Sequence, residues 1–108
     1  MMEQRNQIEG QQEFTALCIR IKELVDQDEY EKSEFLIKEA MGKYPHAPQP
    51  HNLIGLVQEA QGNHLIAMKH FRAAYALDPT YFPAQRNLEH FGTFCYEGKW
   101  AYGVLDEL

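Results

Sequence analysis

A pattern of side-chain sizes recurs at a constant offset along this chain of 108 residues, and it restricts the possible folds more than any other feature. Small residues match small ones, bulky residues match bulky ones, and proline matches proline. The matched pairs are Ser33 with Ala67, Ile37 with Phe71, Ala40 with Ala74, and Pro45 with Pro79. The offset is about 34 residues, and a fixed period of this length is typical of proteins that stack similar structural units. We therefore expect a repeat architecture.

The spacing of apolar residues inside each period predicts α-helices. Apolar side chains recur every three or four residues over four stretches, and this spacing places them along one side of a helix. The stretches are 14–25, 30–44, 53–60 and 65–77. Asn63 is expected to cap the fourth helix, after a turn at Gly62. No stretch has the alternation typical of a strand, so the chain is predicted to be all-α.

Residues 48–81 carry the repeated pattern most completely, with Gly55 where two helices would cross and Gly62 in the turn between them. This pattern resembles the tetratricopeptide repeat, a helix-turn-helix unit whose usual period, about 34 residues, matches the offset. Residues 14–47 resemble the family less closely, since Ile21 stands where glycine or alanine is usual. The resemblance implies tetratricopeptide-like helical hairpins stacked in a right-handed superhelical array, with a C-terminal capping helix.

The same pattern divides the chain into four parts. Residues 1–13 are a polar N-terminal extension or the start of the first helix, residues 14–47 are the first repeat, and residues 48–81 are the second. Residues 82–108 are a partial third repeat or a capping helix with an aromatic tail. Glu89 replaces the small residue that a complete third repeat would have at the crossing of its helices.

Charge and composition exclude several classes of function. Ten Lys and Arg against sixteen Asp and Glu give a net charge of -6, which repels nucleic acid and anionic membranes. The first residues lack the long apolar run of a secretory signal or a membrane-spanning helix, so we expect a cytoplasmic protein. Cys18 and Cys95 are far apart in the sequence and predict two reduced thiols rather than a metal knuckle or a disulfide framework.

No catalytic, metal or cofactor site is expected. The five histidines include no pair at i, i+4 and no HExxH motif, which are the spacings that place two ligands on one helix face. The sequence also lacks a GxSxG elbow, a P-loop and a dinucleotide fingerprint. The chain is therefore not expected to be an enzyme.

The resemblance implies a binding surface on the concave side of the array, where the first helix of each unit receives a peptide or a helix of a partner protein. Asn52 and Gln49 can bond a peptide backbone there, and Lys22 and Arg86 can meet carboxylates. The expected wall consists of Lys22, Gln49, Asn52, Leu56, Glu59, Arg86 and His90. The alternative for any one of them is an ordinary solvated surface residue. The clamp by which some co-chaperones of the family hold a C-terminal carboxylate is not expected, because Lys22 and Leu53 occupy the positions of its asparagines.

The C-terminal tail is the second candidate surface, since it holds five of the thirteen aromatic residues of the chain. These residues are Phe91, Phe94, Tyr96, Trp100 and Tyr102. Stacked repeats leave an apolar face at each end, so the rings are expected to cap the second unit. The alternatives are that they complete a homodimer or occupy a groove in a partner.

Three functions follow, in order of preference. The first is a protein-protein interaction module, an adaptor or scaffold that binds a peptide or helix of a partner on its concave face. The second is a structural module that associates with its own copies through the aromatic tail, because two units alone are marginal in stability. The third is a regulatory subunit of an enzyme.

Overall fold

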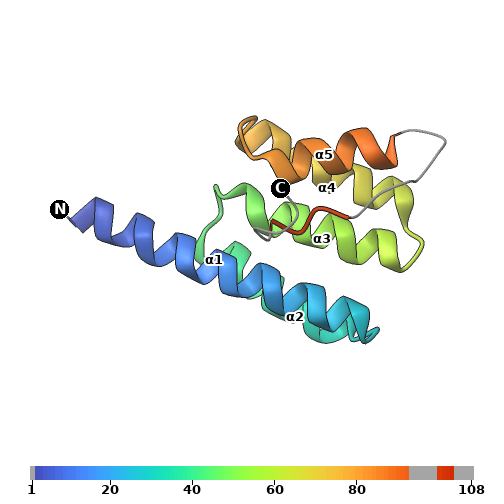
Figure 1. Ribbon diagram of the computed structural model, residues 1–108, viewed down its shortest axis with the longest axis horizontal. Helices are drawn as coiled ribbons and strands as arrows, with labels where there is room; N and C mark the ends of the chain where they lie inside the picture. The colour runs from blue at the N-terminus through green and yellow to red at the C-terminus, as the bar shows by residue number, and fades with distance from the viewer. Residues whose placement is uncertain (1, 93–99, 104–108) are drawn as a thin grey trace.

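The computed structural model describes residues 2–92 and 100–103, with side chains from Gly10 onward, and shows five α-helices in this part of the chain (Figure 1). They are α1 (Met2–Asp26), α2 (Tyr30–Lys43), α3 (Pro48–Ala60), α4 (His64–Leu77) and α5 (Phe82–Phe91). No strand occurs among the described residues. The prediction of an all-α protein is therefore confirmed.

The residues matched by the repeat are the ones that the helices bury against each other. Ser33, Ile37 and Ala40 are the buried residues of α2, and their partners in α4 are buried as well. The repeat extends to the backbone of the turns, where Asp28 and Gly62 both have positive φ, of 57° and 84°. Gly62 suits that conformation because it has no Cβ to clash. The period in the sequence thus corresponds to a repeated local structure.

Asn63 stands at the N-cap of α4, as expected, but its side chain makes no capping hydrogen bond. Its amide instead donates to Oε1 of Gln58 at 2.8 Å, across the turn. Helices α3 and α5 each have a proline in the first two positions, where a missing N–H is harmless because the helix has no acceptor for it.

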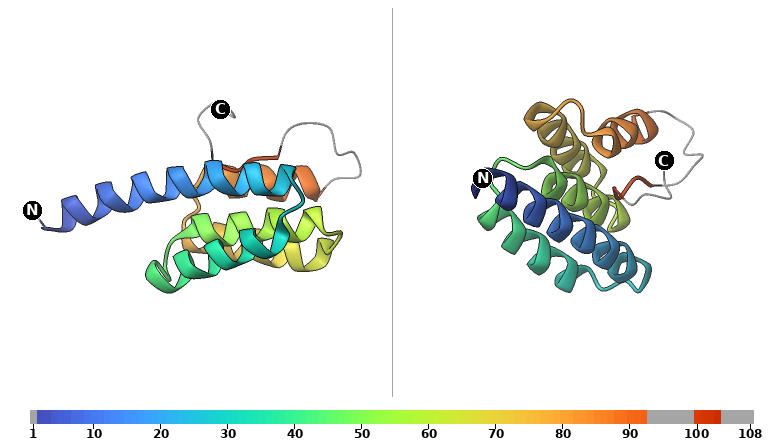
Figure 2. Two further views of the ribbon diagram at one scale, coloured as in Figure 1. Left: turned by 90° about the horizontal axis from the view of Figure 1, so that it is seen from below. Right: turned by 60° about the vertical axis from the view of Figure 1, so that its left-hand side comes forward.

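Helix α3 is the centre of the molecule, since it packs against each of the other four helices (Figure 2). All residues from Asn52 to Val57 are buried. The middle of this helix is enclosed by its neighbours, and a segment in that position is expected to be apolar, as residues 53–57 are. At Gly55 the approach is close, because a Cβ there would lie only 2.4 Å from Cε1 of Phe71 in α4.

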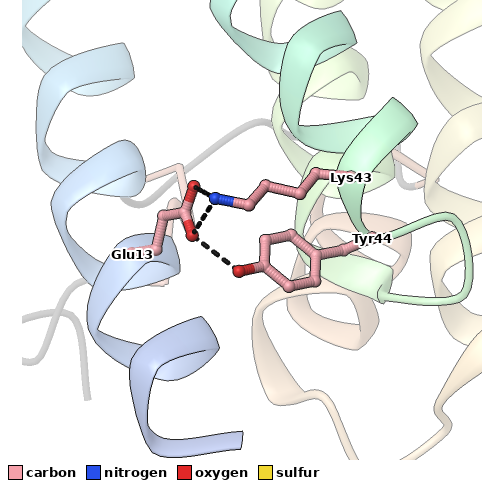
Figure 3. Close-up of polar contacts among 3 residues, drawn as sticks. All are labelled: Glu13, Lys43 and Tyr44. Atoms are coloured by element: carbon pink, nitrogen blue, oxygen red, sulfur yellow. Dashed lines mark hydrogen bonds and ion pairs between the residues drawn. The ribbon is translucent and has the colours of Figure 1, made fainter. Parts of the chain in front are cut away.

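Helix α1 begins at Met2, so the polar residues 2–13 continue the first helix rather than form a separate extension. Glu13 in this part of α1 accepts a hydrogen bond from Tyr44 Oη at 2.6 Å and pairs with Lys43 Nζ at 3.2 Å (Figure 3). The ring of Phe14 also meets the ring of Tyr44 edge to face, with centroids 4.8 Å apart. These contacts tie α1 to the end of α2, and they lower the pKa of the Glu13 carboxyl through the Tyr44 bond first and Lys43 second.

None of the described helices is at once long enough and apolar enough to cross a lipid bilayer.

Candidate functional site

A short non-helical segment of the chain, residues 100–103, lies across the three helices α1, α3 and α5 (Figure 1). Trp100 meets Phe91 of α5 edge to face, with ring centroids 5.3 Å apart. The ring of Tyr102 lies 5.9 Å from Nζ of Lys22 in α1. We call the surface that holds this segment the α1–α3–α5 face. It is defined by Cys18, Lys22, Asn52, Asn87 and Phe91.

Two buried asparagines of this face hold the backbone of Ala101. Asn52 Nδ2 in α3 and Asn87 Nδ2 in α5 both donate to the carbonyl oxygen of Ala101, at 2.9 and 2.8 Å. The N–H of Ala101 donates in turn to Oδ1 of Asn87 at 3.0 Å, and Asn87 Nδ2 also donates to Oδ1 of Asn52 at 2.8 Å. Both polar groups of one peptide residue are therefore satisfied by side chains.

Burial makes this network energetically important. Asn52 and Asn87 are 0% and 1% exposed, and Ala101 is 3% exposed. A buried amide without a partner costs about 1–3 kcal/mol. Loss of either the asparagines or the backbone of the segment would therefore leave buried polar groups without hydrogen bonds. The contacts also involve only main-chain atoms of Ala101, so they do not depend on the side chain at that position.

The end of the segment is fixed by Gly103, which has a φ of 96°. A Cβ at this residue would lie 2.6 Å from Tyr81 Oη and 3.4 Å from Cys18 Sγ. Only glycine fits this position without strain, because the conformation is left-handed and the space beside it is filled.

An open pocket of about 570 Å³ adjoins the segment. It is lined by Lys22, Val25, Asp26, Tyr30, Ala60, Trp100 and Tyr102. Its volume is within the range of sites that bind small ligands or side chains. The segment therefore leaves part of the surface between α1 and α3 uncovered.

The structure corrects the prediction of an open concave wall at two of its residues. Asn52 is fully buried and bonds to the chain's own Ala101, and Leu56 is fully buried in the apolar core. Neither side chain is exposed to solvent as a free binding surface, because residues 100–103 and the neighbouring helices cover them. Lys22 does lie at the face, where it lines the pocket and approaches Tyr102.

The other four predicted wall residues are not brought together in one site. Gln49 is half-buried, and its Oε1 has no hydrogen-bond partner among the described residues. Glu59 pairs with His64 at 2.9 Å across the turn between α3 and α4. Arg86 is exposed on α5. His90 is half-buried and meets the ring of Phe91 edge to face.

Asn87 was not among the residues that the sequence predicted for this surface, although it bonds to Ala101 there. The repeat assigns Arg86 to the position of Asn52 and assigns Asn87 to the position of Leu53, a fully buried apolar residue. One residue turns a helix by about 100°, so an error of one residue selects a different face. In α5 the position equivalent to Leu53 faces Ala101, and this explains why a polar residue occupies it. The polar side chain at a predicted core position was the signal in the sequence.

The aromatic tail lies partly inside the fold. Phe91 is buried and stacks on Phe71 of α4, with ring centroids 5.6 Å apart. Tyr102 is 4% exposed, and Trp100 packs partly buried against the core. Phe94 and Tyr96 lie outside the described residues. The rings whose positions are described thus cover the molecule's own α1–α3–α5 face and α4.

Two histidines face each other between α3 and α4. The Nδ1 atoms of His51 and His70 are 3.3 Å apart, and the rings stack with centroids separated by 5.5 Å. Burial lowers the pKa of both imidazoles, and the pKa of His70 is lowered further by the charge that His51 would carry. Both rings are therefore favoured in the neutral form, in which one nitrogen can donate a hydrogen bond to the other.

Within residues 2–92 and 100–103, no group of three or more histidine, cysteine or acidic side chains is arranged to hold a metal ion.

Comparison with family models, with curated proteins and with solved structures finds no match to this chain.

Proposed function

We propose that this protein is a tetratricopeptide-like interaction module that binds a non-helical peptide segment of a partner protein on its α1–α3–α5 face. The observation that carries the proposal is the bonding of Ala101 by Asn52 and Asn87. These side chains satisfy the donor and the acceptor of one peptide residue, which is how a surface can bind a peptide through its backbone.

The family assignment in this proposal rests on residues rather than on a match to relatives. The constant offset of the repeat, the positive φ at both Asp28 and Gly62, and the close contact of Gly55 with Phe71 all support tetratricopeptide-like hairpins. In such an array the first helix of each hairpin lines the binding surface. Here the corresponding helices are α1, α3 and α5, and they are the three that hold residues 100–103.

Charge reversal at Lys22 tests the proposal. Lys22 lies at the rim of the face and lines the open pocket, so Lys22→Glu changes the electrostatic potential that a partner meets there. The tagged full-length protein would be used to capture partners from extracts of the source cells, with mass spectrometry as the measurement. We expect Lys22→Glu to reduce the amount of the main captured protein at least several-fold, since interface charges control partner choice.

Lys38→Glu is the matched control, because it makes the same change in net charge at an exposed position of α2. We expect this variant to capture as much partner as the wild type. Equal capture by both variants, with circular dichroism showing both folded, would mean that partners do not bind at the α1–α3–α5 face.

A further inference from the structure

The residues around 100–103 contact the side chains of this segment as well as its backbone. Trp100 lies against Phe91, and Tyr102 is buried beside Lys22. Between them Ala101 bonds to the two asparagines and is 3% exposed, so a larger side chain at this position would have to displace close-packed neighbours. The face is therefore complementary to the order aromatic, small, aromatic.

The segment makes contacts that a separate peptide can reproduce. It belongs to none of the five helices, and the backbone of Ala101 bonds to the side chains of Asn52 and Asn87. The same donors and acceptors are available to any peptide of matching side-chain order. A longer peptide would gain more contact, because the open pocket beside Trp100 and Tyr102 is also lined by Val25 and Ala60.

We infer that the α1–α3–α5 face binds a partner segment with the pattern aromatic-small-aromatic, and that residues 100–102 of the chain hold this site until the partner segment replaces them. The inference rests on the proposed function and names the chemistry of its partner. A site that is occupied from within has a lower apparent affinity for an external ligand, in proportion to the fraction of molecules in which it is open.

Gly103→Ala is the variant that opens the site without altering the face. Its Cβ would meet Tyr81 Oη at 2.6 Å, and its φ of 96° is strained for any residue with a side chain. The probe is a fluorescently labelled, end-blocked peptide with the sequence Trp-Ala-Tyr-Gly, and fluorescence anisotropy measures its Kd. We expect Gly103→Ala to bind this peptide about tenfold more tightly than the wild type, since the strain of one left-handed residue corresponds to roughly that factor.

Two matched controls accompany this variant. Gly62→Ala imposes a similar strain, with a φ of 84° and open space around the added Cβ, in the turn before α4. We expect it to bind the peptide as the wild type does. The second control is the peptide Trp-Leu-Tyr-Gly, and its Kd for Gly103→Ala should be at least about tenfold weaker because leucine does not fit the enclosed position of Ala101.

Trp100→Ala is a second opened variant, which removes the aromatic anchor of the segment and adds no backbone strain. If Gly103→Ala and Trp100→Ala are both folded and neither binds Trp-Ala-Tyr-Gly more tightly than the wild type, the inference is wrong. It is also wrong if Gly103→Ala binds Trp-Leu-Tyr-Gly as tightly as Trp-Ala-Tyr-Gly, or if Gly62→Ala gains as much affinity as Gly103→Ala. If the opened variants capture more of the Lys22-dependent cellular partner but ignore the tetrapeptide, the proposed function stands and this inference alone fails.

Discussion

Asn87 shows how a single residue can link the fold to the site. It lies at a position that the repeat assigns to the apolar core, yet its amide contacts both Asn52 and Ala101. A polar side chain in a buried position is tolerated only when its hydrogen bonds are complete. The presence of residues 100–103 beside α5 is therefore what makes asparagine suitable at this position.

The effect of Asn87→Ala follows from this arrangement. The change removes the acceptor of the Ala101 N–H and one of the two donors to its carbonyl oxygen, and it leaves Asn52 Oδ1 without its donor. We expect the free energy of unfolding to fall by about 1–3 kcal/mol, the usual cost of leaving buried polar groups unpaired. Urea denaturation followed by circular dichroism measures the change.

Glu89→Ala is the control for this prediction, because it alters an exposed residue of the same helix. We expect the free energy of unfolding to change by no more than about 0.5 kcal/mol, as for most surface substitutions. A cost for Asn87→Ala no larger than that for Glu89→Ala would mean that the Asn87 network does not stabilise the fold.

At the scale of elements, helices α3 and α4 share the most extensive contact of any pair of described helices. Their contact includes Gly55 against Phe71 at one point and the histidine pair at another. The glycine contact depends on size, and the histidine contact depends on protonation. The stability of this pair of helices should therefore respond to pH.

The folded state favours neutral His51 and His70, since the pKa of each lies below the ordinary value of 6.5. The unfolded chain consequently binds more protons on the acidic side of that value, and stability decreases as the pH falls. The contribution of the two histidines to the free energy of unfolding is complete above about pH 6.5. It is lost as the pH decreases toward their lowered pKa values. We expect the free energy of unfolding to decrease by less than about 1 kcal/mol from about pH 7.5 to 5.5, because both rings are partly solvated.

Thermal or urea denaturation over this pH range measures the loss, and carboxylates contribute little because they titrate at lower pH. The double variant His51→Gln with His70→Gln should make the free energy of unfolding depend less on pH over this range. His46→Gln, an exposed residue of the loop between α2 and α3, should leave it unchanged. An unaltered slope in the double variant would show that the pair does not carry the effect.

At the scale of the whole molecule, the aromatic residues Phe91, Trp100 and Tyr102 lie within the fold of one chain. An aromatic surface that is already buried is not available for a second copy. We therefore expect a monomer of 12.6 kDa in light scattering over a wide range of concentration.

A dimer would support the alternative of a self-associating module. If that dimer were lost in Gly103→Ala, residues 100–103 would be exchanged between copies, each segment occupying the face of the other molecule. If the dimer persisted in Gly103→Ala, a different surface would hold it, such as the exposed apolar side chains Phe35 and Leu65.

Local sequence patterns were enough to predict the helices and the contacts within each hairpin. The repeat located the matched buried positions in α2 and α4, and Gly55 marked the crossing with Phe71, because contacts close in the sequence depend on helical spacing and on side-chain size. The same patterns do not distinguish an extension from a helix at the polar start, since Glu13 finds its partners Lys43 and Tyr44 only when α2 has folded back.

What covers the α1–α3–α5 face depends instead on the packing of the whole chain. The repeat placed Asn52 on an open wall and aligned Arg86 with it, but the folded chain buries Asn52 under Ala101 and turns Asn87 toward the same carbonyl. Residues 52 and 101 are far apart in the sequence, and no local pattern encodes their meeting. It results from the packing of residues 100–103 against α1, α3 and α5 at once, which requires all three helices to be in place.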